Sequence, residues 1–120
     1  METKKAESFI AACKSIRMLN PQIRISQIEM LYQIGIHEPI SLTDLGHKCN
    51  ITISGISRMM DFMTREERKD GTETAIGWVE AEKVFNDDRP KQLWLSRKGR
   101  VVLETLLGSM EQEYPRNSDQ

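Results

Sequence analysis

The spacing of apolar residues predicts two helices in the first part of the chain. The first is expected from about Lys4 to Leu19, because the proline at position 21 interrupts the helical pattern. The second is expected to start at a cap on Ser26, with Glu29 three residues further on as in a capping box. Its apolar face continues to His37, where the pattern ends.

A helix-turn-helix pattern follows. A short third helix can be capped by Ser41 or Thr43, and Asn50 suits the left-handed residue that ends it. Thr52 caps a longer fourth helix, whose apolar and polar positions fall on opposite faces. The apolar set is Ile53, Ile56, Met59, Met60 and Met63, and the polar set is Ser54, Ser57, Arg58 and Asp61. A short helix, a tight turn and a longer helix with a small polar outer face are typical of helix-turn-helix proteins.

From Gly77 to Gly99 the pattern changes to two short strands joined by a charged turn at Asn86–Pro90. Ser96 then caps a last helix, which is expected to reach about Tyr114. The order of these elements predicts a mainly α-helical fold with a small β-hairpin, namely a winged helix-turn-helix with a two- to three-stranded wing.

The same pattern predicts how the chain is divided. Residues 1–25 form an N-terminal helix and residues 97–114 a C-terminal helix. Residues 26–96 form the winged helix-turn-helix domain, and residues 115–120 a disordered tail. The polar segment Thr64–Ile76 is expected to extend the fourth helix by one or two turns and then to loop back.

Composition is ordinary for a soluble globular domain, with 38% hydrophobic and 29% charged residues and a net charge of −1. No apolar run is long enough to cross a bilayer, and the N-terminus lacks the apolar core of a signal peptide. Two cysteines cannot make a disulfide framework, so a cytoplasmic location is expected. Residues 48–100 carry eleven basic and nine acidic side chains, whereas residues 101–120 carry one basic and four acidic. Positive charge therefore lies mildly towards the half that contains the helix-turn-helix and the hairpin.

The sequence resembles the MarR-type winged-helix transcriptional regulators. The matching stretches are Ser41–Asp61, the Gly-Trp-Val at 77–79 and Asp87–Gly99, in which an Asp-x-Arg is followed by Leu-Ser-x-x-Gly. The resemblance implies a homodimer built by the terminal helices and a double-stranded, palindromic DNA operator. Two features differ from the family pattern: the segment Thr64–Ile76 is longer, and the terminal helices are shorter.

The start of the fourth helix is the expected DNA-reading element, because only small polar side chains let a helix backbone approach the major groove. Its candidate contacts are Thr52, Ser54, Gly55, Ser57 and Arg58. The hydroxyl of Thr52 and the helix N-terminus can donate to phosphate, and Arg58 can reach phosphate or a guanine edge. The alternative interpretation is a solvated helix face.

The hairpin supplies a second candidate site. A thin strand pair can place the Arg89 guanidinium in the narrow, negatively charged minor groove beside the major-groove contact. The resemblance implies that Asp87 helps to hold this arginine. Lys83 and Lys91 are candidate phosphate contacts, as are the basic residues at positions 97 and 98, and all of these charges are otherwise simply solvated.

Other chemistry-bearing residues have simpler interpretations. Cys13 and Cys49 suggest a redox sensor, but neither has a visible resolving partner, so both are expected to fill the core. The two histidines have no zinc-ligand spacing and are expected on the surface. Met59, Met60 and Met63 are expected to pack the core rather than to line a ligand pocket. Since no catalytic, metal or cofactor motif is present in the sequence, we expect neither an enzyme nor a metal or cofactor.

The sequence therefore predicts a cytoplasmic, sequence-specific DNA-binding regulator that acts as a homodimer and represses a promoter by occupying it. Two alternatives remain open at this point. One is a winged-helix module that binds proteins instead of DNA, which the low net charge, Asp61 and the acidic C-terminus favour. The other is a sensor of the same fold that responds to a small molecule or, through Cys13, to an oxidant.

Overall fold

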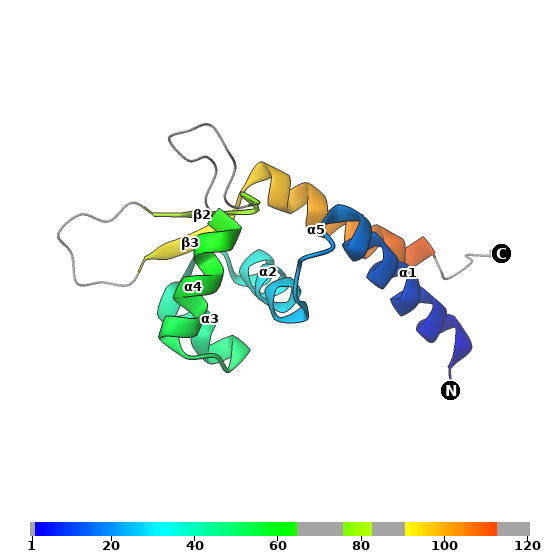
Figure 1. Cartoon of the computed structure of the whole chain (residues 1–120), viewed down its shortest axis with the longest axis horizontal. Coiled ribbons are helices and arrows are strands. Elements are labelled where there is room, and N and C mark those ends of the chain that lie inside the picture. The colour runs from blue at the N-terminus through cyan, green and yellow to red at the C-terminus, as the bar shows by residue number, and fades with distance from the viewer. Residues whose placement is uncertain (1, 65–75, 83–90, 113–120) are drawn as a thin grey trace. The chain divides into compact units, whose positions relative to one another are not determined.

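The computed structural model describes residues 2–64, 76–82 and 91–112, with side chains as far as residue 108. Its elements are α1 (Thr3–Leu19), α2 (Ile25–His37), β1 (Ile40–Ser41), α3 (Leu42–Cys49), α4 (Ile53–Thr64), β2 (Val79–Ala81), β3 (Gln92–Leu95) and α5 (Arg97–Gln112), drawn in Figure 1. The chain forms two compact units. Residues 24–100 make one unit, and residues 1–23 together with residues 101–120 make the other.

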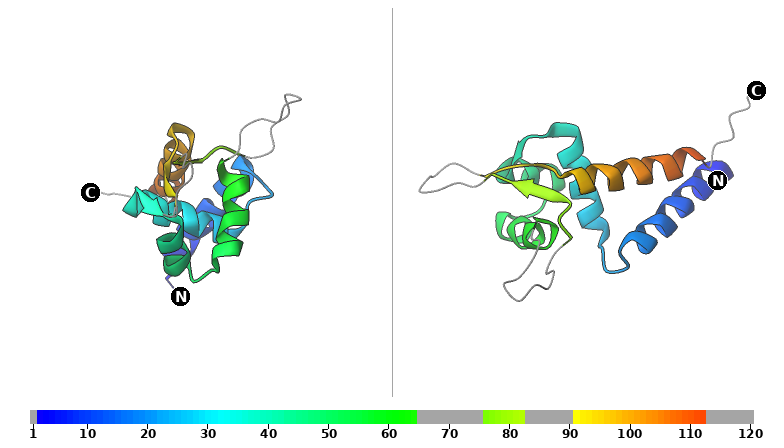
Figure 2. Two further views of the ribbon diagram at one scale, coloured as in Figure 1. Left: turned by 90° about the vertical axis from the view of Figure 1, so that its left-hand side faces the viewer. Right: turned by 90° about the horizontal axis from the view of Figure 1, so that it is seen from above.

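The unit of residues 24–100 is built around a small antiparallel sheet in the order β1-β3-β2. Ile40 pairs with Leu93, and Val79 pairs with Leu95, so the side chains of these four residues lie on one face of the sheet. Helix α2 packs against α3 and β3, while α4 packs against α3 and β2. Figure 2 shows α4 and the strands from two further sides. The fully buried side chains of this unit are Met30, Leu31, Ile34, Leu45, Ile56, Met63, Leu93 and Val79.

The turn between α3 and α4 is formed as the sequence predicts. Asn50 adopts the left-handed conformation with φ 60°, and its N–H donates to the carbonyls of Gly46 and His47 at the end of α3. The N–H of Ile51 also donates to the carbonyl of Gly46, at 2.9 Å. Ser41, rather than Thr43, caps α3 by accepting the N–H of Asp44 at 3.0 Å.

The chain returns from α4 to the sheet along the last turn of that helix. Ile76 N–H donates to the Phe62 carbonyl at 2.9 Å, and Trp78 N–H donates to the Met63 carbonyl at 2.8 Å. These bonds connect the last described turn of α4 to the segment that leads into β2. The described residues of α4 are Ile53–Thr64. The expected extension of this helix falls on residues 65–75, outside the described residues.

The start of α5 is fastened to the same segment, and the predicted cap on Ser96 is confirmed. The Ser96 hydroxyl accepts the N–H of Gly99 at 3.0 Å and donates to the Gly77 carbonyl at 2.7 Å. The N–H of Ser96 donates to the Trp78 carbonyl at 3.1 Å. Gly99 lies so close to this carbonyl that a Cβ on it would stand 1.9 Å from the oxygen. The Leu-Ser-x-x-Gly motif therefore joins α5 to the backbone that precedes β2.

Two sequence predictions about helices α2 and α4 are wrong. Ser26 does not cap α2: the helix begins at Ile25, because the Gln27 side chain accepts the N–H of Arg24 at 2.7 Å and the Arg24 carbonyl already accepts helical bonds. The capping box with Glu29 is therefore absent. Ile53 does not join the buried face of α4 but is 45% exposed, because it is the first residue of the helix and lies at the edge of the packed face.

The other unit contains α1 and the part of α5 that begins at Val101. Its buried side chains are Ser8 and Ala12 on α1, with Val102 and Leu106 on α5. Several large apolar side chains on the two helices are exposed instead. These are Phe9, Ile10, Met18, Leu19, Val101 and Leu107.

Candidate nucleic-acid interface

The first turn of α4 is held by its cap. Thr52 Oγ1 accepts the N–H of Gly55 at 3.2 Å and lies 3.5 Å from the hydroxyl of Ser54. A capping hydroxyl uses its oxygen as the acceptor, so its proton is left available for a neighbouring acceptor. Thr52 is exposed. Its hydroxyl can therefore cap the helix and donate to an anionic oxygen at the same time.

The outer face of α4 is polar from Ser54 to Asp61. Ser54, Ser57, Arg58 and Asp61 are all exposed, as the helical spacing predicts. Ile56, Met60 and Met63 are buried on the opposite side and Met59 is half-buried, so the prediction that the methionines pack the core is confirmed for Met60 and Met63. The packing of these apolar residues presents the polar face outwards.

Two glycines allow the close approach of the elements around α4. A Cβ on Gly55 would stand 3.0 Å from Ile51 Cγ2 and 3.2 Å from Thr52 Oγ1, so a side chain at this position would press on the cap. A Cβ on Gly46, which is buried in α3, would stand 3.0 Å from the Ile51 carbonyl oxygen. Half-buried Gly55 thus faces the turn between the helices, and it adds no side chain to the surface of α4.

Further candidate contacts lie around this helix. Lys91 is exposed at the start of β3, and its carbonyl accepts the N–H of Leu42 at 2.9 Å, which places it at the N-terminus of α3. Sequence reasoning did not single out Lys48, which is exposed in the last turn of α3 beside the turn into α4. The sequence could have identified Lys48 as a candidate phosphate contact from its position in the first, shorter helix of the pair. The first helix of such a pair crosses the DNA backbone. Ile53 was missed as a surface residue for the reason given above.

The hairpin residues predicted to contact DNA lie outside the described part of the chain. These are Lys83, Asp87 and Arg89. The strands that lead to and from them are described, with Ala81 paired to Leu93 as the last residue pair of the β2–β3 ladder.

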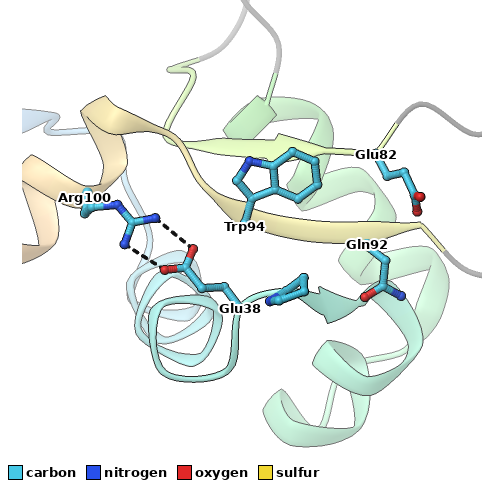
Figure 3. A pocket seen from close by; sticks show the side chains of 6 residues that line it. Glu38, Glu82, Gln92, Trp94 and Arg100 are labelled. Atoms are coloured by element: carbon cyan, nitrogen blue, oxygen red, sulfur yellow. Dashed lines mark hydrogen bonds and ion pairs between the residues drawn. The ribbon is translucent and has the colours of Figure 1, made fainter.

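The outer face of the sheet carries a shallow cavity of about 470 Å³, shown in Figure 3. Glu38 is its central ionic group: it accepts two hydrogen bonds from Arg100, at 2.8 and 3.2 Å, and one from Leu95 N–H at 2.9 Å. Trp94 lies beside this pair and donates its indole N–H to Glu80 at 3.0 Å. Glu38 thus connects the segment before β1 to β3 and to the start of α5.

The pKa of Glu38 reflects these contacts. Partial burial raises the pKa of its carboxyl, but the hydrogen bonds from Arg100 and Leu95 and the positive charge of Arg100 outweigh burial and hold it below its ordinary value. The carboxylate form is therefore the one that the fold stabilises.

The cysteines and histidines differ in exposure. Cys49 is buried, and burial first, then the nearby Glu29 charge, raises the pKa of its thiol and disfavours the thiolate. Its predicted role as a core residue is confirmed, whereas Cys13 is half-buried on α1. His37 and His47 are exposed as expected. Among the described residues, no group of three or more His, Cys, Asp or Glu side chains could hold a metal ion.

Comparison with known proteins identifies the fold. No protein-family model matches the chain, and no curated protein matches its sequence. Solved structures do match, among them RV1404 of Mycobacterium tuberculosis, with a TM-score of 0.69 and 21% identity over 92% of this chain and 69% of that one. MarR of Listeria monocytogenes, a multiple antibiotic-resistance repressor, matches with a TM-score of 0.66 and 23% identity over 87% of this chain and 63% of that one. A mutant MarR of E. coli in complex with operator DNA matches with a TM-score of 0.64 and 19% identity over 92% of this chain and 71% of that one.

The chain has the fold of the MarR-type regulators. The predicted winged-helix fold is thereby confirmed, as five helices and a three-stranded antiparallel sheet among the described residues. In this MarR-type fold, α3 and α4 form the helix-turn-helix, and β2 and β3 form the base of the wing. Within the part of the chain that the structure describes, none of the helices combines the length and the apolar character needed to cross a membrane.

Proposed function

We propose that the protein is a sequence-specific, double-stranded DNA-binding transcriptional regulator that acts in the cytoplasm as a homodimer and represses a promoter by occupying it. The observation that carries this proposal is the exposed polar face of α4, which begins at a capped N-terminus in a fold shared with regulators solved on DNA. The recognition helix of such folds enters the major groove with its N-terminal residues at the base edges.

Each residue of this face has a role that follows from its chemistry. The Thr52 hydroxyl and the free N–H groups of the first turn bind a phosphate, since a helix N-terminus attracts anions. Ser54 and Ser57 are short enough to let the helix approach, and their hydroxyls can bond to base edges. Arg58 lies one turn beyond Ser54 and reaches a guanine or a phosphate.

The wing extends this contact to the flanking minor groove. Arg89 enters that groove and Asp87 supports it, while Lys83 and Lys91 bind phosphates on either side. Of these four, the exposed Lys91 lies within the described residues. Because the chain carries a net charge of −1, affinity depends on the position of a few cations rather than on overall charge.

Dimerisation is supported by apolar surface on the unit formed by α1 and the later part of α5. Phe9 is 58% exposed and Met18 is 87% exposed on α1, and Val101 is 57% exposed on α5. Apolar side chains exposed together on one unit favour an interface. We expect Phe9→Asp to convert a dimer into a monomer in analytical ultracentrifugation and to weaken operator binding, because each half-site then binds independently. If the sedimentation of the wild-type protein bound to its operator corresponds to one protomer per duplex, this part of the proposal is refuted.

The experiment that tests the proposal is selection of binding sites from random DNA duplexes, followed by affinity measurements across a salt series. We expect a palindromic site whose half-sites lie about one helical turn apart, and an affinity that falls steeply as salt rises. Arg58→Ala should weaken binding about tenfold, and comparison on scrambled duplexes separates a base contact from a phosphate contact. Arg17→Ala is the matched control, because it removes an exposed arginine from α1, outside the helix-turn-helix.

A protein-binding winged helix is the competing function, and exposed Asp61 on the α4 face is the observation that favours it. A carboxylate at this position repels the DNA phosphates. Its favourable contact with DNA would be to accept a hydrogen bond from the amino group of a cytosine. The two functions separate in the first experiment: failure to retain any duplex at low salt refutes DNA binding.

A further inference from the structure

Ile53 is an unusual member of the proposed reading face. It is the first residue of α4, and its side chain is 45% exposed, whereas Ile56 and Met63 of the same helix are fully buried. Its neighbours Thr52 and Ser54 are short and polar. Ile53 is therefore the large apolar side chain presented at the N-terminal end of this face.

The side chain of Ile53 is also held in place. Its Cδ1 lies 3.5 Å from the point where a Cβ on Gly46 would stand, so this end of the side chain rests over the buried glycine of α3. A β-branched residue in a helix has one strongly preferred χ1 rotamer, which restricts the rest of the side chain further. Ile53 thus presents a fixed apolar surface rather than a flexible one.

The residues that flank Ile53 along α4 carry no formal charge. Thr52 and Ser54 flank it in sequence, Ser57 follows one turn later on the same side, and the charged residues of the face begin at Arg58. A large apolar group is poorly suited to a phosphate or to the polar edge of a base. It is suited to a methyl group, and thymine is the unmodified base that shows one in the major groove.

We propose that Ile53 recognises the 5-methyl group of a thymine, and so selects one base pair in each half-site of the operator. This inference rests on the proposed function, because it requires α4 to lie in the major groove. It adds a specificity determinant that differs in kind from the hydrogen-bonding residues Ser54 and Ser57. The ligand chemistry is that of a 5-methylpyrimidine, so 5-methylcytosine at the same place should be preferred to cytosine.

The test is a methyl scan of the selected operator. Each thymine is replaced in turn by deoxyuridine, which removes one methyl group and leaves base pairing unchanged. Affinity is measured for the wild type, for Ile53→Ala and for Ile36→Ala, which removes a 69% exposed isoleucine from α2 as a matched control. We expect one thymine per half-site whose replacement lowers wild-type affinity about fourfold, from the loss of one buried methyl group, and about fifteenfold when both are replaced.

The variants decide the source of that loss. Ile53→Ala should bind the thymine and deoxyuridine duplexes equally at this position, while Ile36→Ala should discriminate between them as the wild type does. Ile53→Val should keep part of the discrimination. A scan in which no thymine matters, or in which Ile53→Ala shows the same methyl dependence as the wild type, overturns the inference while sequence-specific binding persists. Absence of binding to every duplex would refute the proposed function itself, and the inference with it.

Discussion

The substitution Gly99→Ala tests how the first turn of α5 packs against the backbone that precedes β2. The new Cβ would stand 1.9 Å from the Trp78 carbonyl oxygen, 2.9 Å from its carbon and 3.2 Å from its Cα. Since an ordinary contact is about 3.5 Å, the two backbone segments must separate by roughly 1.5 Å. No flexible side chain lies between them that could move instead.

This separation has a cost that can be worked out from the contacts. Overpacking at a tight site costs about 1–3 kcal/mol. The shift also weakens the bond from Ser96 N–H to the Trp78 carbonyl and the bond from the Ser96 hydroxyl to the Gly77 carbonyl, each with a net value of about 1 kcal/mol. We therefore expect Gly99→Ala to lower the free energy of unfolding by about 3–5 kcal/mol, a large part of the ~5–15 kcal/mol of a typical domain.

The same helix provides a control with the opposite expected sign. Among the residues that the structure describes, a Cβ on Gly108 would meet no atom within 4 Å. Gly108→Ala should therefore stabilise α5 by up to about 1 kcal/mol, because alanine loses less backbone entropy in a helix. Ser96→Ala gives an intermediate loss of about 1–2 kcal/mol from the missing cap and the unsatisfied Gly77 carbonyl, which remains measurable if Gly99→Ala does not fold.

Urea unfolding followed by circular dichroism measures all three variants. The expected order of stability is Gly108→Ala, wild type, Ser96→Ala and Gly99→Ala. A Gly99→Ala protein within about 1 kcal/mol of the wild type would show that α5 can move away from Trp78 freely. That result would refute the argument that the Leu-Ser-x-x-Gly motif is a packing requirement.

Two further predictions concern the wing and the ion pair. Arg89→Ala should weaken operator binding about tenfold and lower the slope of the salt dependence by about one, with a nearly unchanged thermal midpoint; a large loss of stability at unaltered affinity would mark Arg89 as structural. Glu38→Gln should lower stability by about 1 kcal/mol or less near pH 6, because half of the Arg100 side chain is exposed and the pair is partly screened. Because the pKa of Glu38 is lowered by folding, its contribution is present above the ordinary glutamate pKa of about 4.3 and is lost as pH falls through the lower folded-state value. Urea midpoints of the two proteins should therefore converge as pH falls below the ordinary glutamate pKa, and a difference that stays constant as pH falls would assign the effect to something other than the charge of Glu38.

The helix-turn-helix and the start of α5 could be predicted from the sequence because their signals are local. Thr52 and Ser96 are caps, Asn50 is the left-handed exit, and the polar residues of α4 fall on one side, all within one or two turns of the residues they serve. The start of α2 could not be predicted as well, because Ser26 and Gln27 offer competing ways to satisfy the first N–H groups. The exposed fraction of the Ile53 side chain depends on the position of α3, and the periodicity of the sequence gives no information about that position.

By itself, the sequence determined the order of the elements, the caps and the two faces of α4, since these follow from periodicity and from hydrogen bonds between near neighbours. Only the tertiary structure decided which contacts join distant segments. Gly99 packs against the Trp78 carbonyl, and Glu38 binds Arg100, which lies 62 residues further along the chain. The missing side chain of Gly46 leaves space for the end of the Ile53 side chain. These contacts depend on backbone approach and packing in three dimensions, and residues far apart in the chain carry no local signal of them.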